Sequence, residues 1–139
     1  MQNGDYKMAK DYTFKNTIPY APLKIIAMDN CKTFGEKVDD YIVGFRKNDQ
    51  EILKYRESNI DFRGYDRDSY LVQTACPRFG SGEGKGMINE TVRGSDLFII
   101  SDVTNYSMTF NMYGQQHMMS PDDHYQDLKR IIATAMTSA

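Results

Sequence analysis

Cysteine is scarce in this chain, and the two that occur, Cys31 and Cys76, fit no recognised spacing. Two cysteines cannot form a disulfide framework or a tetrahedral zinc cage alone. No apolar run approaches the ~20 residues of a membrane span. The chain begins with the polar segment MQNGDYKMAK, which is not a signal peptide. These absences predict free thiols, a cytoplasmic location and no membrane partner.

Neither sign of charge is in large excess. The chain carries 17 Lys and Arg against 19 Asp and Glu, for a formal net charge of −2. Proteins that hold nucleic acid on a basic face need the opposite balance, so we expect no nucleic-acid partner. The 139 residues, 40% of them hydrophobic, suffice for one globular domain with a core. We place that domain at residues 23–139, after a polar arm at 1–22.

Recognised metal and nucleophile patterns are also missing. His117 and His124 stand seven residues apart with Asp122 and Asp123 beside the second, a spacing that matches no standard metal site. Helix capping accounts for both aspartates. No Ser/His/Asp order stands out, and nothing near Cys76 marks an activated nucleophile. The sequence therefore assigns no catalytic residue and no metal ligand.

Four segments have the composition of strands: 23–28, 69–75, 86–92 and 97–103. The last is almost continuously apolar, which predicts a central strand buried on both faces. The methionine-rich stretch at 105–119 predicts no regular element, and its soft apolar surface suits core filling as well as a subunit interface.

Helical patterns follow the first strand and close the chain. Thr33 and Glu36 have the spacing of a capping box, and an apolar face follows with Phe34, Val38, Tyr41, Ile42 and Phe45. Residues 49–56 predict a further short helix. Ser120 and Pro121 predict the start of the last helix, with an apolar face of Leu128, Ile131, Ile132 and Ala135. Strands alternating with helices predict an α/β fold with a mainly parallel sheet flanked by helices.

Glycines at every second position mark the centre of the chain: Gly80, Gly82, Gly84 and Gly86. Four glycines in register cost conformational entropy, so either something approaches the backbone closely or the chain turns through positive φ. The loop lacks the serine or threonine of a Walker A motif and the third glycine of a dinucleotide fingerprint. Spacing alone leaves open a plain hairpin turn, with an antiparallel pair of strands around it.

The residues around this loop resemble a known family. Arg78-Phe79-Gly80-Ser81-Gly82-Glu83 is followed by Ile88-Asn89-Glu90-Thr91-Val92-Arg93-Gly94-Ser95-Asp96-Leu97-Phe98-Ile99-Ile100. This order is similar to the N-terminal domain of ribose-phosphate pyrophosphokinase, which carries Arg/Lys-Phe-Ser-Asp/Asn-x-Glu, a strand, and then Ile-x-Glu-Ser-Val/Ile-Arg-Gly-x-Asp. The resemblance implies the N-terminal half of a type I phosphoribosyltransferase-like fold, in a divergent bacterial-type branch.

The resemblance also implies site residues. In the family, the phenylalanine–acid loop contacts the adenine end of ATP bound to a neighbouring subunit, and by position this role falls to Phe79, Ser81 and Glu83. Ser81 departs from the usual Asp or Asn, and Gly80 replaces a serine. The Ser/Thr-x-Arg turn near an allosteric phosphate site corresponds to Thr91 and Arg93. The alternative for that arginine is an internal ion-pair turn with the acids that flank it.

The family transfers the pyrophosphoryl group of ATP to ribose 5-phosphate with Mg²⁺, in homo-oligomers that share active sites. It uses an Arg-Gln-x-x-Lys loop, a metal-binding histidine and an Asp-Asp-x-x-x-Thr-Gly-Gly-Thr loop, none of which occurs here. We therefore expect an N-terminal part that is inactive alone and holds neither Mg²⁺ nor ATP by itself. The alternatives are a non-catalytic homologue that binds nucleotide or a partner subunit, and an unrelated α/β domain with a glycine hairpin.

Overall fold

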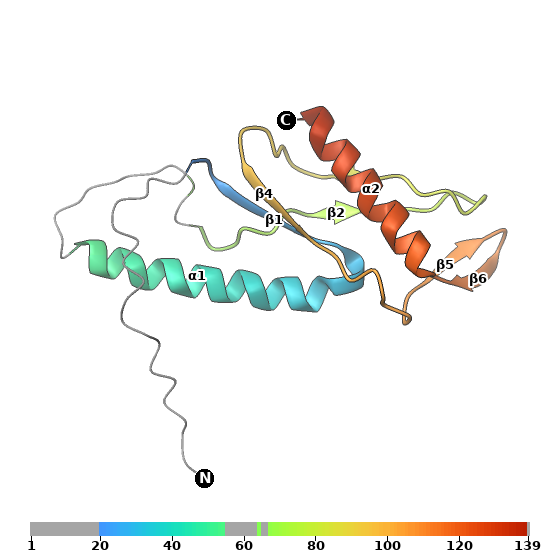
Figure 1. Cartoon of the computed structure of the whole chain (residues 1–139), viewed down its shortest axis with the longest axis horizontal. Coiled ribbons are helices and arrows are strands. Elements are labelled where there is room, and N and C mark those ends of the chain that lie inside the picture. The colour runs from blue at the N-terminus through green and yellow to red at the C-terminus, as the bar shows by residue number, and fades with distance from the viewer. Residues whose placement is uncertain (1–19, 55–63, 65–66, 139) are drawn as a thin grey trace, which may run out of the picture.

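The structure, a computed structural model, describes residues 20–54, 64 and 67–138. Its elements are β1 (Leu23–Ala27), the 3-10 turn η1 (Asp29–Cys31), α1 (Lys32–Lys54), β2 (Thr74–Ala75), β3 (Met87–Ile88), β4 (Asp96–Ile100), β5 (Thr109–Met112), β6 (Gln115–Met118) and α2 (Pro121–Ser138). Figure 1 shows the two long helices on either side of short strands. The predicted arm at 1–22 lies almost entirely outside the described residues.

The α/β class is confirmed, with a small parallel sheet centred on β1. β1 pairs in parallel with β4, from Leu23 opposite Asp96 to Ala27 opposite Ile100. On its other side, Ile25 forms a parallel bridge with Leu71, through backbone hydrogen bonds of 2.8 Å to Tyr70 O and from Val72 N. Residues 70–72 are thus the part of the predicted strand at 69–75 that joins this sheet. β1 is therefore the central strand, and it brings Met28 to the carboxyl edge of the sheet.

The prediction that 97–103 forms a central strand was wrong. Within the described ranges no strand pairs with the outer edge of β4, and the side chain of Phe98 is 55% exposed. An apolar run shows that a segment has a high preference for burial, but not whether a neighbouring strand covers it.

The predicted antiparallel pair around the glycine loop is present. β2 and β3 pair through Thr74 with Ile88 and Ala75 with Met87, and an antiparallel bridge between Arg78 and Gly84 extends the pairing toward the loop. Both strands are shorter than predicted, at two residues each.

The helix α1 covers one face of the sheet, and its start, its length and its buried positions differ from the prediction. Thr33 lies inside the helix rather than at its cap, because η1 leads directly into it. The helix also continues to Lys54, so no separate helix begins at residue 49. Among its residues up to Asn48, the buried ones are Gly35, which packs on Ala27, and Asp39, whose carboxylate accepts a 2.7 Å hydrogen bond from Tyr70 N.

The predicted apolar face of α1 is therefore wrong in part. Phe34 and Tyr41 are 60% and 63% exposed, and Phe45 is 37% exposed. The small glycine permits a close approach to β1, and the buried Asp39 binds a backbone amide; both are features that hydrophobic periodicity does not detect.

The helix α2 begins as predicted and covers the opposite face. Ser120 Oγ accepts a hydrogen bond from Asp123 N at 3.2 Å, and the Asp123 carboxylate accepts one from Ser120 N at 2.9 Å. Ile131 and Ala135 enter the core beside Ile26, Val72 and Val92. Ile132, predicted on the same face, is instead 40% exposed. In the described ranges, neither helix combines the length and apolarity that crossing a membrane would require.

Candidate functional site

The glycine segment folds as a tight hairpin loop. Phe79 N donates to Glu83 O at 2.8 Å, Gly82 N donates to Phe79 O at 2.8 Å, and Lys85 N donates to Pro77 O at 3.0 Å. Gly82 has φ +87°, a left-handed conformation that a residue with a Cβ adopts only with strain. One of the four glycines is thus explained by the turn itself.

The other glycines are explained mainly by packing within the chain. A Cβ on Gly86 would lie 2.8 Å from the carbonyl carbon and oxygen of Arg130 in α2, and one on Gly84 would lie 3.0 Å from Asp127 Oδ1. A Cβ on Gly82 would also lie 2.7 Å from Met112 Sδ, whereas one on Gly80 would meet nothing within 4 Å. The close approach inferred from the sequence is therefore made by α2 and by the hairpin of β5 and β6.

The three residues predicted to contact adenine lie together at the tip of this loop. Phe79 is 57% exposed, and Ser81 and Glu83 are exposed as well. The tip, residues 79–83, is therefore directed away from the core, and a ligand held by another molecule could reach it. Their role in binding stays a prediction.

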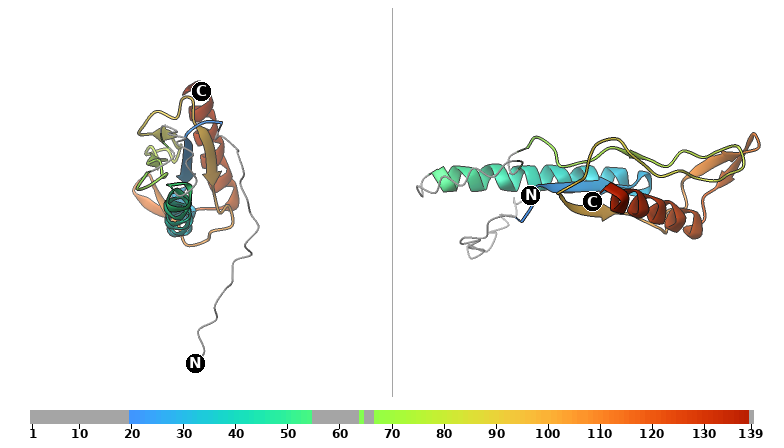
Figure 2. Two further views of the ribbon diagram at one scale, coloured as in Figure 1. Left: turned by 90° about the vertical axis from the view of Figure 1, so that its left-hand side faces the viewer. Right: turned by 90° about the horizontal axis from the view of Figure 1, so that it is seen from above.

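A second hairpin, which the sequence did not predict, supports the loop. β5 and β6 pair from Thr109 opposite Met118 to Met112 opposite Gln115, and the turn residue Tyr113 donates its backbone N–H to Gly80 O at 2.9 Å. The right-hand view in Figure 2 shows this hairpin and the glycine loop at the same end of the molecule. Two-residue hairpin turns usually carry Asn-Gly or Asp-Gly; here Tyr113-Gly114 takes that place, so the usual signal is absent.

The base of the loop is held by a buried ion-pair cluster. The Arg78 guanidinium donates to Asp127 Oδ2 at 2.8 Å, and Arg130 donates to Oδ1 of the same carboxylate at 2.8 Å. The side chains of Arg78 and Asp127 are only 9% and 8% exposed, and Arg78 also lies 4.9 Å from the centre of the Phe110 ring. Burial raises the pKa of the Asp127 carboxyl, while both arginines oppose that shift.

A cleft of about 400 Å³ opens beside this cluster at the carboxyl end of β1. Its lining is shared among the segment after β1, the glycine loop, β5 and α2, and comprises Met28, Asp29, Asn30, Cys76, Arg78, Met108, Thr109, Phe110, Asn111, Met119, His124 and Asp127. Open α/β sheets commonly bind ligands at this edge. Sequence reasoning missed the cleft because its lining is dispersed over four segments.

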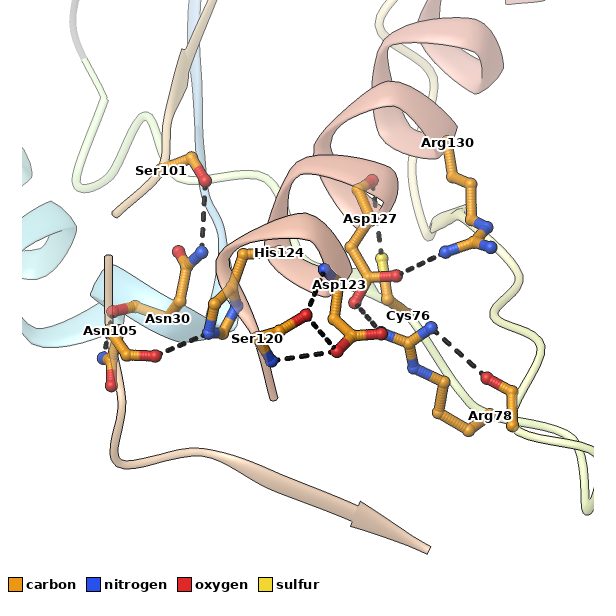
Figure 3. Close-up of polar contacts among 11 residues, drawn as sticks. Asn30, Cys76, Arg78, Ser101, Asn105, Ser120, Asp123, His124, Asp127 and Arg130 are labelled. Carbon is orange, nitrogen blue, oxygen red and sulfur yellow. Dashed lines mark hydrogen bonds and ion pairs between the residues drawn. The ribbon is translucent and has the colours of Figure 1, made fainter. Parts of the chain in front are cut away.

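The polar groups of the cleft are largely occupied by one another (Figure 3). His124 is 2% exposed and its Nε2 lies 2.7 Å from Asn105 O, while Asn105 Nδ2 donates to Asn30 O at 2.7 Å. Asn30 Nδ2 in turn donates to Ser101 Oγ at 3.1 Å. Among the described side chains, every buried nitrogen and oxygen has a partner. This network joins α2 to the ends of β1 and β4.

Both cysteines are free thiols, as predicted. Burial raises the pKa of the Cys76 thiol to about 11 and also raises the pKa of Cys31. The Cys31 thiol donates to Ile100 O at 3.0 Å. Protonated, partly buried thiols are poor nucleophiles, so their chemistry is that of small apolar side chains.

The turn before β4 contains the residues predicted to bind an allosteric phosphate. Thr91 and Arg93 are exposed and line a shallow depression together with Ile88, Asn89 and Glu90. Arg93 N donates to Thr91 Oγ1 at 3.3 Å. The Glu90 carboxylate pairs with the buried Lys24 at 2.7 Å, and Lys24 also donates to Thr91 O at 2.6 Å. Lys24 therefore fixes this turn to β1, and the role of Thr91 and Arg93 stays a prediction.

Metal ligation finds no support in the described ranges, where no three His, Cys, Asp or Glu side chains lie close enough together to hold an ion. His117 instead packs its ring 5.9 Å from that of Phe110. The described side chains therefore provide no ligand set of three such groups for Mg²⁺.

Comparison with known proteins gives one result for the chain as a whole. The sequence model described as the N-terminal domain of ribose phosphate pyrophosphokinase matches residues 23–139. No curated protein and no solved structure matches.

Proposed function

The chain belongs to the family of N-terminal domains of ribose phosphate pyrophosphokinase, and we propose that it serves as that domain of a pyrophosphokinase. In this proposal the whole enzyme transfers the pyrophosphoryl group of ATP to ribose 5-phosphate and supplies phosphoribosyl pyrophosphate for nucleotide synthesis in the cytoplasm. The match over 23–139 carries the proposal. The finer assignment, the N-terminal half of a type I phosphoribosyltransferase-like fold, is proposed with it.

The part we assign to this chain is to bind the base of ATP held by an adjoining protomer of a homo-oligomer. The exposure of Phe79, Ser81 and Glu83 supports this assignment, because a base that arrives from another subunit needs an outward-facing site. A phenylalanine ring can stack on a purine, and a carboxylate can accept hydrogen bonds from its exocyclic amine. Ser81 is shorter than the usual aspartate, so we expect it to contact the base through water.

We do not assign the binding of the ATP phosphates to Phe79, Ser81 and Glu83. Mg²⁺ would neutralise the polyphosphate and align its oxygens in the whole enzyme. In the described ranges no three His, Cys, Asp or Glu side chains lie close enough together to hold it. Thr91 and Arg93 are proposed as an effector site for phosphate, since guanidinium matches phosphate oxygens with paired donors.

A turnover assay tests the proposal that the chain supplies binding and not the reacting groups. The chain is mixed with ATP, Mg²⁺ and ribose 5-phosphate, and phosphoribosyl pyrophosphate is measured. We expect no product above the level of a protein-free control. Robust turnover by the chain alone would contradict the division of roles.

A second assay tests the base contact. Phe79→Ala is compared with Phe98→Ala, since both phenylalanines are more than half exposed but only one lies at the loop tip. The chain alone is expected to contact the base only and so to hold no ATP at ordinary concentrations, but nucleotide in large excess makes this weak contact measurable. We expect Phe79→Ala to weaken the contact and Phe98→Ala to leave it unchanged. Equal effects would refute the assignment of the tip.

A non-catalytic homologue that binds nucleotide or a partner subunit is the second candidate, favoured by the absence of the three catalytic motifs from these 139 residues. The gene sequence distinguishes the enzyme domain from the non-catalytic homologue. A reading frame that encodes a strand and Arg-Gln-x-x-Lys after Ala139 supports the enzyme, and a stop codon there supports the binding module.

A further inference from the structure

The turn of the β5–β6 hairpin holds an unusual residue. Tyr113 has φ +49°, the only positive φ at a non-glycine residue among those described. Tyrosine is bulky, and bulky residues in this conformation are uncommon. A two-residue turn with positive φ at both positions ordinarily carries Asn or Asp before the glycine. The site therefore has a tyrosine where an asparagine would fit with less strain.

This tyrosine does not contribute to the core. Its side chain is 79% exposed, so the strain is not offset by burial. Strained residues that neither bury surface nor ease the turn are found at ligand-binding sites more often than elsewhere. The strained and exposed Tyr113 therefore has a role other than packing among the described residues.

The position of Tyr113 next to the loop tip indicates what this role is. Its backbone N–H donates to Gly80 O at 2.9 Å, which fixes the hairpin turn to the residue directly after Phe79. Met112, the residue before it, packs against Gly82 of the same loop. Two exposed aromatic side chains, Phe79 and Tyr113, are thus presented by two turns that are bonded to each other.

We propose that Tyr113 is a second aromatic contact for the planar heteroaromatic base bound at the loop tip, beside Phe79 and Glu83. This inference rests on the proposed function, because it takes the tip as the base site. Aromatic side chains bind bases by stacking, which tolerates different bases because each has a π face. Tyr113 therefore raises affinity for the base, whereas Glu83 selects for an exocyclic amine.

Substitution by asparagine separates binding from folding. Tyr113→Asn removes the ring and places a residue preferred for this turn, so the variant is expected to unfold at the same temperature as the wild type or at a higher one. Tyr113→Phe keeps the ring and tests whether the hydroxyl contributes. Tyr106→Asn is the matched control, because Tyr106 is 66% exposed but lies outside both turns.

The assay is saturation-transfer NMR on the chain with adenosine 5′-monophosphate, and with ribose 5-phosphate as a probe without a base. We expect saturation of the adenine protons for the wild type and for Tyr106→Asn. The apparent affinity of Tyr113→Asn should fall by roughly five- to hundredfold, the usual contribution of one stacked base, with no change for Tyr113→Phe. Thermal unfolding of each variant is followed by circular dichroism.

The outcomes distinguish the claim that Tyr113 contacts the base from the claim that the loop tip is the base site. If Phe79→Ala weakens binding and Tyr113→Asn does not, the role of Tyr113 is refuted while the tip remains the base site. If neither variant changes the adenine signal, or the wild type gives none, both claims fail. A loss for Tyr113→Asn together with lower thermal stability would show only that the hairpin had been disrupted, and would overturn the inference.

Discussion

Replacement of Gly86 by alanine tests the claim that this glycine permits the close approach of α2 to the loop. A Cβ at this position would lie 2.8 Å from the carbonyl carbon and oxygen of Arg130 and 3.1 Å from its Cβ. Ordinary contacts begin at 3.4 Å, so backbone must move by about 0.6 Å, the difference between 3.4 and 2.8 Å. The contact is with helix backbone, which cannot be relieved by rotation of a side chain.

The expected cost follows from studies of overpacking. Methyl groups inserted into well-packed interiors destabilise proteins by about 1–3 kcal/mol. For a domain of this size that corresponds to a melting temperature lower by roughly 3–15 °C. Chemical denaturation and a thermal scan, both followed by circular dichroism, measure the change.

Gly80→Ala is the matched control within the same series. A Cβ at Gly80 meets nothing within 4 Å, and its φ is not positive. Alanine there reduces only the freedom of the unfolded chain, which is stabilising by up to about 1 kcal/mol. If Gly86→Ala were as stable as Gly80→Ala, the packing explanation of the alternating glycines would be refuted.

Two further substitutions and the behaviour of Cys76 have definite expected results. Gly35→Ala should destabilise the protein in urea unfolding despite the better helix propensity of alanine, because its Cβ would collide with Ala27; a gain in stability would contradict the packing of α1 on β1. Asp127→Asn should cost about 3–5 kcal/mol in the same assay, because it leaves the buried Arg78 without its carboxylate, and a cost below 1 kcal/mol would show that the cluster is not needed. Cys76 should react far more slowly with iodoacetamide at pH 8 than a free cysteine does, because its pKa of about 11 keeps the thiol protonated. The folded pKa lies above the unfolded value of 9.0, so stability should also fall as the pH rises from 9 to 11, and a stability that is constant over that range would contradict the shift.

The sequence predicted elements best where a signal is local. Ser120 and Pro121 marked the start of α2 correctly, because a cap and a proline act on the adjacent backbone. The similar signal at Thr33 failed, since the chain enters α1 through η1 and needs no cap there. The same pattern of residues thus gives different results depending on the backbone that precedes it.

Features that depend on distant partners could not be predicted. The position of β4 at the edge of the described sheet depends on which strands pair, and its apolar run does not record this. The network of Asn30 and His124 joins residues far apart in the sequence. The hairpin at 109–118 was missed because Tyr113 occupies its turn, and the methionines there proved mixed in burial, with Met119 buried and Met118 68% exposed.

The candidate site likewise has features that the sequence predicted and features that it did not. Similarity of short motifs led to the prediction that Phe79, Ser81 and Glu83 act together, and the structure places all three at one exposed tip, where their role stays a prediction. What the motif could not indicate is the support behind the tip, where Arg78 binds Asp127 and the hairpin turn binds Gly80. These contacts join residues more than 30 positions apart.

Chemical-shift mapping of the ¹⁵N-labelled chain with an adenosine nucleotide tests the central claim most directly. The account predicts that the largest amide shifts occur at residues 79–83, in the loop that presents Phe79 and Glu83. Shifts confined to the cleft around Asn30 and His124, with the loop unchanged, would contradict it.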